Sequence, residues 1–155
     1  MTVARLEACY RHHCLRKNFT REVAEAVASG SAALERAGAW LLVRVAREAG
    51  GLAAADWEIV VDGLAGVRAW TARLQLCQLL ASQPALADAA PGEIADFVRT
   101  CAVDPKPFVR AWGISALHAL GRHYPRHRAE ARRWLARGRS DPAKSVQARM
   151  RRLEE

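Results

Sequence analysis

One nine-residue pattern occurs twice in the chain, as DGLAGVRAW from Asp62 and as DPKPFVRAW from Asp104, 42 residues later. A third copy, DPAKSVQARM, starts 37 residues further on at Asp141 and has Gln147 in place of the arginine. Sequence repeats of this length are typical of helix pairs that stack and bury their apolar sides against their neighbours. A degenerate fourth copy starts at Ser29, so the repeat predicts a helical array along most of the chain.

The composition and the spacing of apolar residues both favour helices. Alanine, leucine, arginine and glutamate dominate, and apolar residues recur three and four positions apart, as in Val109, Trp112, Ala116 and Leu120. Prolines at first-turn positions and glycines after helix ends mark the boundaries. The predicted helices cover residues 3–17, 20–28, 32–49, 52–61, 67–82, 92–102, 107–120, 125–138 and 142–153.

These helices predict one all-α domain over residues 1–155, a right-handed α-solenoid of about four antiparallel helix pairs plus an N-terminal helix. The N-terminal helix falls within residues 1–19. The pairs cover residues 20–49, 52–82, 91–121 and 125–153. A chain of this length can bury its own hydrophobic core.

The pattern D-P-x-x-x-V-R-x-x-A, present as DPKPFVRAWGISA and less fully in the other copies, resembles the HEAT repeat over roughly residues 20–153. The resemblance implies that the turn aspartate and the arginine six residues later form a ladder between successive repeats. Gln147 interrupts this ladder in the last copy. The resemblance assigns the structural ladder to Asp62, Arg68, Asp104, Arg110 and Asp141.

Elementary chemistry favours the same structural role for these residues. An aspartate that precedes a helix accepts hydrogen bonds from free N–H groups of the first turn, and its charge suits the positive end of the helix dipole. An arginine one and a half turns later can reach a carboxylate with two parallel donors. We therefore interpret VRAW as a structural motif, with Trp70 and Trp112 as packing residues.

The net charge of +8 is concentrated near one end of the chain. Residues 122–153 hold eleven lysines and arginines against Glu130 and Asp141, whereas the rest of the chain is close to neutral. Arginines on both flanks of a helix from Pro125 predict a broad positive surface, which would attract nucleic-acid phosphates or an acidic protein. A solvated end cap of the array is the alternative. The candidate basic face consists of Arg110, Arg122, Arg126, Arg128, Arg132, Arg133, Arg137 and Arg139.

The segment CYRHHC, residues 9–14, combines residue types that bind zinc. Cys9 and His13 share a helix face, with His12 beside them, but Cys14 lies about 140° around the helix from Cys9, so the four cannot converge on one ion. We expect no metal there and interpret the segment as an amphipathic first helix. The four cysteines of the chain are too few for a disulfide framework and are predicted to be reduced thiols.

Sequence patterns for catalysis are weak. None of the five histidines is followed by glutamate, unlike the His-Glu pairs of HEAT-repeat di-iron hydroxylases. The short glycine segments at Ser29 and Gly50 lack the lysine of a phosphate-binding loop, and no third group is placed to orient a Cys-His pair. We therefore expect no catalytic residue and no cofactor, and favour a protein that is not an enzyme.

Two functions follow from this interpretation. The first is a non-catalytic interaction module that binds a protein partner through its stacked helices. The second is nucleic-acid binding, because FVRAWGISALHALG, residues 108–121, is similar to the repeat of HEAT-like DNA alkylation-repair glycosylases. That similarity implies duplex DNA on a basic face. The family's catalytic aspartate and tryptophans have no match here, so the similarity does not extend to catalysis.

Location and oligomeric state are less constrained by the sequence. The lack of a long apolar segment and of a signal peptide predicts a cytoplasmic protein that does not enter a membrane. An apolar flank on the first helix, formed by Leu6, Tyr10 and Cys14, leaves both a monomer and an end-to-end homodimer open.

Overall fold

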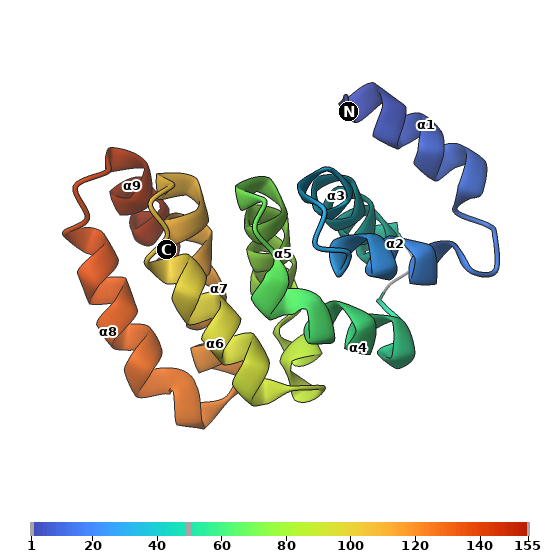
Figure 1. Ribbon diagram of the computed structural model, residues 1–155. Helices are drawn as coiled ribbons and strands as arrows, with labels where there is room; N and C mark the ends of the chain where they lie inside the picture. Colours follow the sequence, from blue (N-terminus) through green and yellow to red (C-terminus); the bar gives the residue numbers. More distant parts are fainter. Residues whose placement is uncertain (1, 49–50, 155) are drawn as a thin grey trace. The chain divides into compact units, whose positions relative to one another are not determined.

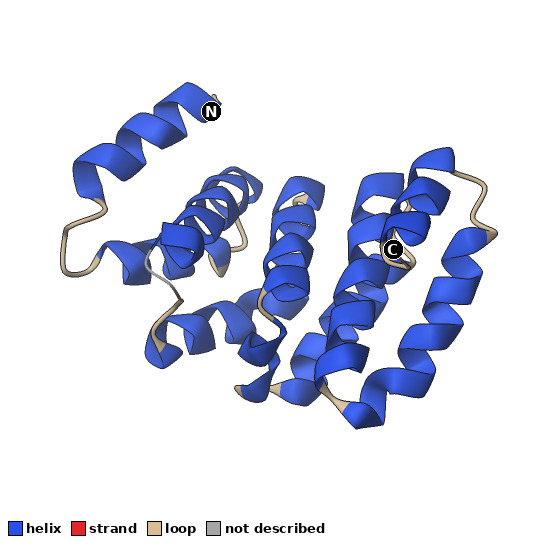
Figure 2. Ribbon diagram, turned by 180° about the vertical axis from the view of Figure 1, so that it is seen from behind, coloured by secondary structure: helices blue, strands red, loops and turns tan. Residues whose placement is uncertain are grey.

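A computed structural model describes residues 2–48 and 51–154 of the chain. These residues form α-helices and short 3-10 helices, with no β-strand among them (Figure 2). The all-α class expected from the sequence is confirmed. Within the described ranges, the α-helices are α1 (Val3–His13), α2 (Phe19–Val27), α3 (Ala32–Glu48), α4 (Ala54–Gly63), α5 (Trp70–Ser82), α6 (Pro91–Ala102), α7 (Pro107–His123), α8 (Arg128–Arg139) and α9 (Lys144–Arg152).

The chain divides into two compact units, Met1–Gln75 and Leu76–Glu155, and α5 crosses from the first to the second. In the first unit α2 packs against both α3 and α4. Helix α1 contacts α3, and the ring of Tyr10 in α1 meets Phe19 of α2 edge to face at 6.1 Å. The apolar faces of α2, α3 and α4 form the core of this unit, with Val27, Leu42, Trp57 and Val60 among its buried side chains.

In the second unit α7 is the central helix. It packs against α6 on one side and α8 on the other, and the short helix α9 contacts both α7 and α8 (Figure 1). Ile94 and Val98 of α6, Ile114 and Leu117 of α7 and Met150 of α9 are buried in this core. Because α7 contributes buried residues to both of its neighbours, its apolar surface is wider than the stripe of a surface helix.

Most helix boundaries match the prediction within about three residues. Helix α1 ends at His13 instead of residue 17, because the chain turns there so that Phe19 can be buried against Tyr10. Helix α5 begins at Trp70 instead of residue 67, because Val67 is extended, with φ −66° and ψ 114°. A 3-10 helix, Pro125–His127, precedes α8.

The helices that follow the repeat turns are 37 residues apart. Helices α5, α7 and α9 begin at Trp70, Pro107 and Lys144. In this register Ala72, Val109 and Val146 are equivalent, and each has an exposed fraction of 0%. In the structure, the position equivalent to Val109 is therefore Ala72 and not Val67. The offset of 42 residues inferred from the repeated DxxxxVRAW pattern differs from the 37-residue spacing of the helices.

No helix in the described part of the chain combines the length and the apolar character that crossing a lipid bilayer requires.

Candidate functional site

The turns before α7 and α9 share one hydrogen-bonding arrangement. Asp104 accepts a hydrogen bond from the backbone N–H of Lys106 at 2.8 Å, and Asp141 accepts one from the N–H of Ala143, also at 2.8 Å. Each aspartate thus binds an N–H group at the start of the helix that follows, where the helix dipole favours negative charge.

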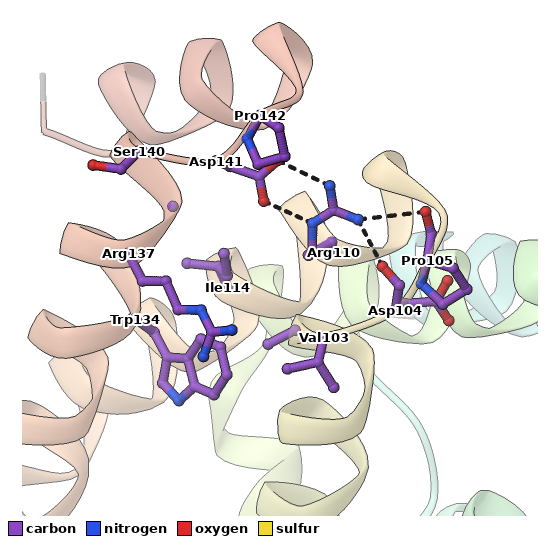
Figure 3. Close-up of a pocket in the computed structure, with 12 residues that line it drawn as sticks. Val103, Asp104, Pro105, Arg110, Ile114, Trp134, Arg137, Ser140, Asp141 and Pro142 are labelled. Atoms are coloured by element: carbon purple, nitrogen blue, oxygen red, sulfur yellow. Dashed lines mark hydrogen bonds and ion pairs between the residues drawn. The ribbon is translucent and has the colours of Figure 1, made fainter.

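Asp141 also binds a side chain from the preceding repeat. Arg110 of α7 donates from Nε and Nη2 to the two oxygens of Asp141 at 2.7 and 2.9 Å, and from Nη1 to the carbonyl oxygen of Asp104 at 2.7 Å (Figure 3). This bidentate pair is shielded from solvent, because the side chains of Arg110 and Asp141 are only 17% and 9% exposed. The pair lowers the pKa of Asp141 and raises that of Arg110 relative to their ordinary values.

Arg110 lines a cavity of about 410 Å³ between the turn after α6 and the end of α8 (Figure 3). Its charged groups already have partners within the protein, since Arg110 is held by Asp141 and the guanidinium of Arg137 stacks 5.2 Å from the ring centre of Trp134. The cavity therefore lies at the contact between two helix pairs, and its two arginines already have partners, so they are poorly placed to bind a ligand. Arg110 belongs to this structural contact and not to an open basic face.

Asp62 and Arg68 lie in different surroundings from Asp104 and Arg110. Asp62 is exposed in the last turn of α4, and Arg68 is exposed in the extended segment before α5. Arg73 donates to the carbonyl oxygen of Arg68, five residues earlier, at 3.3 Å. Arg110 likewise donates to the carbonyl oxygens of Pro105 and Asp104, five and six residues earlier, at 3.4 and 2.7 Å. The structure thus brings Arg110 and Asp141 together, whereas Asp62 and Arg68 form no ion pair with any described residue.

Gln147 repeats this contact in the turn before α9. Its Nε2 donates to the carbonyl oxygen of Asp141 at 2.7 Å, six residues earlier. Arg73, Arg110 and Gln147 are 37 residues apart, so alignment at that period would have identified Arg73 from the sequence. The VRAW motif concealed it, because VRAW ends at the first residue of α5 in one copy and lies within α7 in the other.

The remaining candidate arginines lie on α8, at the adjoining end of α7 and, in the case of Arg126, in the 3-10 helix between them. Both carboxylates of residues 122–153 are occupied: Asp141 binds Arg110, and Glu130 accepts hydrogen bonds from Nε and Nη2 of Arg99 in α6 at 2.7 and 2.9 Å. Arg99 lowers the pKa of Glu130 below its ordinary value. Because both acids bind arginines from outside the segment, they do not neutralise the exposed arginines of α8.

A groove of about 320 Å³ lies between α7 and α8, and we call it the α7/α8 groove. It has three exposed guanidiniums and one imidazole on its rim and no carboxylate in its lining, which consists of His118, Gly121, Arg122, Arg128, Ala131, Arg132 and Leu135. Among the residues that the structure describes, none forms an ion pair with Arg122, Arg128 or Arg132. No described carboxylate therefore compensates the positive charge of this groove.

The helix spacing explains how this groove forms. His118 and Arg122 are one turn apart on α7, and Arg128 and Arg132 are one turn apart on α8, so each helix contributes a pair to the same side. Gly121 lets the helices approach closely, since a Cβ atom at that position would lie 2.5 Å from the Cβ of Ala131. Burial and the charge of Arg122 lower the pKa of His118 below its ordinary value.

Other candidate arginines lie outside the groove. Arg126 packs over the ring of Tyr124 at 5.2 Å, and Arg133 is exposed on α8. Arg139 forms an ion pair with Glu154. The candidate face predicted from the sequence is thus divided, with Arg122, Arg128 and Arg132 at the groove, Arg110 and Arg137 at the 410 Å³ cavity, and Arg126, Arg133 and Arg139 elsewhere on this unit.

The CYRHHC segment does not gather metal ligands. Cys9 lies in α1, and Cys14 is the residue that caps its C-terminus. Both are half-buried free thiols. Within residues 2–48 and 51–154, no group of three or more His, Cys, Asp or Glu side chains is arranged to hold a metal ion.

Comparison of the chain with family models, with curated proteins and with solved structures gave no match in any of the three.

Proposed function

We propose that the protein is a non-catalytic helical-repeat module of the HEAT type that binds an acidic protein partner through the arginines of its second unit. In this proposal the helices form a right-handed solenoid of about four pairs behind the N-terminal helix. The 37-residue spacing of α5, α7 and α9 and the bidentate tie from Arg110 to the next turn support the solenoid.

The unbalanced charge of the second unit carries the functional part of this proposal. Residues 76–155 contain fourteen lysines and arginines against eight aspartates and glutamates, a net charge of +6. The arginines of the α7/α8 groove are exposed and have no carboxylate partner among the described residues. Uncompensated guanidiniums attract an oppositely charged surface and speed its association.

A photo-cross-linking experiment in the native cell tests this proposal. Ala129 is exposed on α8, one turn before Arg132 and Arg133, and Ala65 is exposed in the first unit. With Ala129→p-benzoylphenylalanine we expect a protease-sensitive cross-linked product that is lost when Arg128→Glu and Arg132→Glu are added. The matched control is Ala65→p-benzoylphenylalanine. The same products from both positions, or none from Ala129, would show that the arginine surface is not the interface.

Nucleic acid is the second candidate partner, because the exposed arginines Arg126, Arg128, Arg132 and Arg133 recur along consecutive turns and form no ion pair with any described residue. Such a row could follow a phosphate backbone. In a salt titration with a labelled duplex DNA, this function requires binding whose log–log slope becomes shallower in the variant Arg128→Gln/Arg132→Gln. A nuclease-sensitive product in the cross-linking experiment would favour this function over protein binding, and absence of DNA binding at low salt would exclude it.

A further inference from the structure

The charge of the α7/α8 groove exceeds what an ordinary carboxylate ligand would neutralise. Arg122, Arg128 and Arg132 bring three guanidiniums to the rim of one groove. A carboxylate carries one negative charge and two acceptor oxygens, whereas a phosphomonoester carries close to two charges and three strong acceptor oxygens at neutral pH. Three forked donors that form no ion pair with any described residue therefore match a phosphoryl group better than a single carboxylate.

The shape of the groove points to a phosphoryl group attached to a larger molecule. The cationic side chains come from two packed helices, and Gly121, Ala131 and Leu135 supply an uncharged part of the lining. The volume of about 320 Å³ falls within the range of small-ligand pockets and can hold the phosphate together with the side chain that carries it. All three guanidiniums remain exposed, so a group projecting from a partner protein can reach them.

We propose that the α7/α8 groove binds a phosphomonoester on a serine or threonine side chain of the partner protein, held by Arg122, Arg128 and Arg132 with His118 beside it. This inference rests on the proposed function and names the chemical group that the acidic partner presents. Arginine clusters that bind phosphorylated motifs work by the same charge-assisted hydrogen bonds.

Fluorescence anisotropy with the full-length protein tests this site. The probes are labelled degenerate peptides with a central phosphoserine, serine or aspartate, and inorganic phosphate serves as competitor. We expect the phosphoserine peptide to bind about tenfold tighter than the serine peptide. In Arg128→Gln/Arg132→Gln we expect the two peptides to bind with nearly equal affinity. The control Arg133→Gln/Arg151→Gln removes the same charge from exposed positions outside the groove and should retain the advantage.

Each other outcome of this experiment rejects the site or its proposed ligand. An equal loss in the two double variants would show that binding depends only on net charge. Equal affinity for the aspartate and phosphoserine peptides would reject the phosphomonoester while leaving an acidic protein partner intact. Inorganic phosphate that competes at the affinity of the phosphopeptide would show that the groove takes free phosphate and not a group carried by a partner.

The imidazole of His118 gives an independent readout by NMR. Its lowered pKa should rise when a phosphate dianion binds beside it, because nearby negative charge favours the imidazolium form. We expect this rise with the phosphoserine peptide in the unchanged protein and in Arg133→Gln/Arg151→Gln, but not in Arg128→Gln/Arg132→Gln. If the His118 pKa is unchanged by a peptide that binds, the phosphoryl group lies outside the groove.

Discussion

Glu35 shows how one side chain can replace a missing turn residue. The turn before α5 has Val67 at the position where the next two turns have Asp104 and Asp141. In its place Glu35 of α3 accepts hydrogen bonds from the N–H groups of Arg68 and Ala69 at 3.0 and 2.7 Å. Ala69 is 37 residues before Lys106, so the two N–H groups are equivalent. Each donates a hydrogen bond to a carboxylate, that of Glu35 in one repeat and that of Asp104 in the next. A charged residue is thereby retained in a fully buried position.

We predict that Glu35→Ala destabilises the protein by about 2 kcal/mol, because it leaves two N–H groups without an acceptor, one of them on the buried Ala69. Urea denaturation measures this loss. The matched control is Glu25→Ala, which removes an exposed ion pair with Arg21 and should cost less than about 0.5 kcal/mol. Equal losses in the two variants would mean that the hydrogen bonds of Glu35 add nothing to stability.

At the scale of secondary-structure elements, close helix contacts depend on glycines. A Cβ atom at Gly113 of α7 would lie 2.5 Å from the backbone nitrogen of Ala102, at the end of α6. Gly38 of α3 is in a similar position, since its Cβ would lie 2.8 Å from the backbone nitrogen of Val27, at the end of α2. At both glycines the backbone of one helix contacts the backbone of the other, in α6 and α7 and in α2 and α3. Even a methyl group at either position would therefore force the helices apart.

We therefore predict that Gly113→Ala destabilises the protein by about 1–3 kcal/mol, despite the higher helix propensity of alanine. The matched control is Gly92→Ala in α6, where a Cβ atom would meet nothing within 4 Å. That substitution should be neutral or stabilise by up to about 1 kcal/mol. Thermal denaturation of the two variants compares them, and an unchanged melting temperature in Gly113→Ala would contradict the close approach of α6 and α7.

For the molecule as a whole, carboxylates in ion pairs link stability to pH. The pairs Arg110–Asp141 and Arg99–Glu130 each join two helices or turns of the second unit and lower the pKa of the acid. A carboxyl group with a lowered folded pKa stabilises the protein above its unfolded pKa, about 4 for Asp and Glu. This contribution is lost as the pH falls through the folded value.

We predict that Glu130→Gln/Asp141→Asn is less stable than the unchanged protein at pH 7, and that this difference shrinks as the pH falls below about 4. Urea denaturation at a series of pH values measures it. The control Asp62→Asn removes an exposed carboxylate that has no ion pair among the described residues. A difference between the double variant and the unchanged protein that stays constant from pH 7 to pH 3 would show that the two pairs do not contribute to acid unfolding.

The sequence located most helices, but it aligned the VRAW copy at Asp62 with the copy at Asp104 in a register that the helices do not share. Apolar periodicity and proline positions gave the bounds of α6 and α7 within a few residues, since these are local properties. The VRAW motif favoured Asp62 and Arg68 as ladder residues equivalent to Asp104 and Arg110, but identical letters can stand at different helix positions. The acceptor for the turn before α5 is Glu35, 34 residues before Ala69, and no local pattern identifies such a distant partner.

The sequence by itself determined the helical class, the 37-residue spacing of the copies at Asp104 and Asp141 and the concentration of arginine near one end, because propensity, spacing and charge are properties of neighbouring residues. Only the tertiary structure decided which arginines are free. Arg110 and Arg99 bind the two carboxylates of the basic segment, and this leaves Arg122, Arg128 and Arg132 around one groove without an ion pair to any described residue. That outcome depends on which helices pack together, and packing brings together residues that are distant in the sequence.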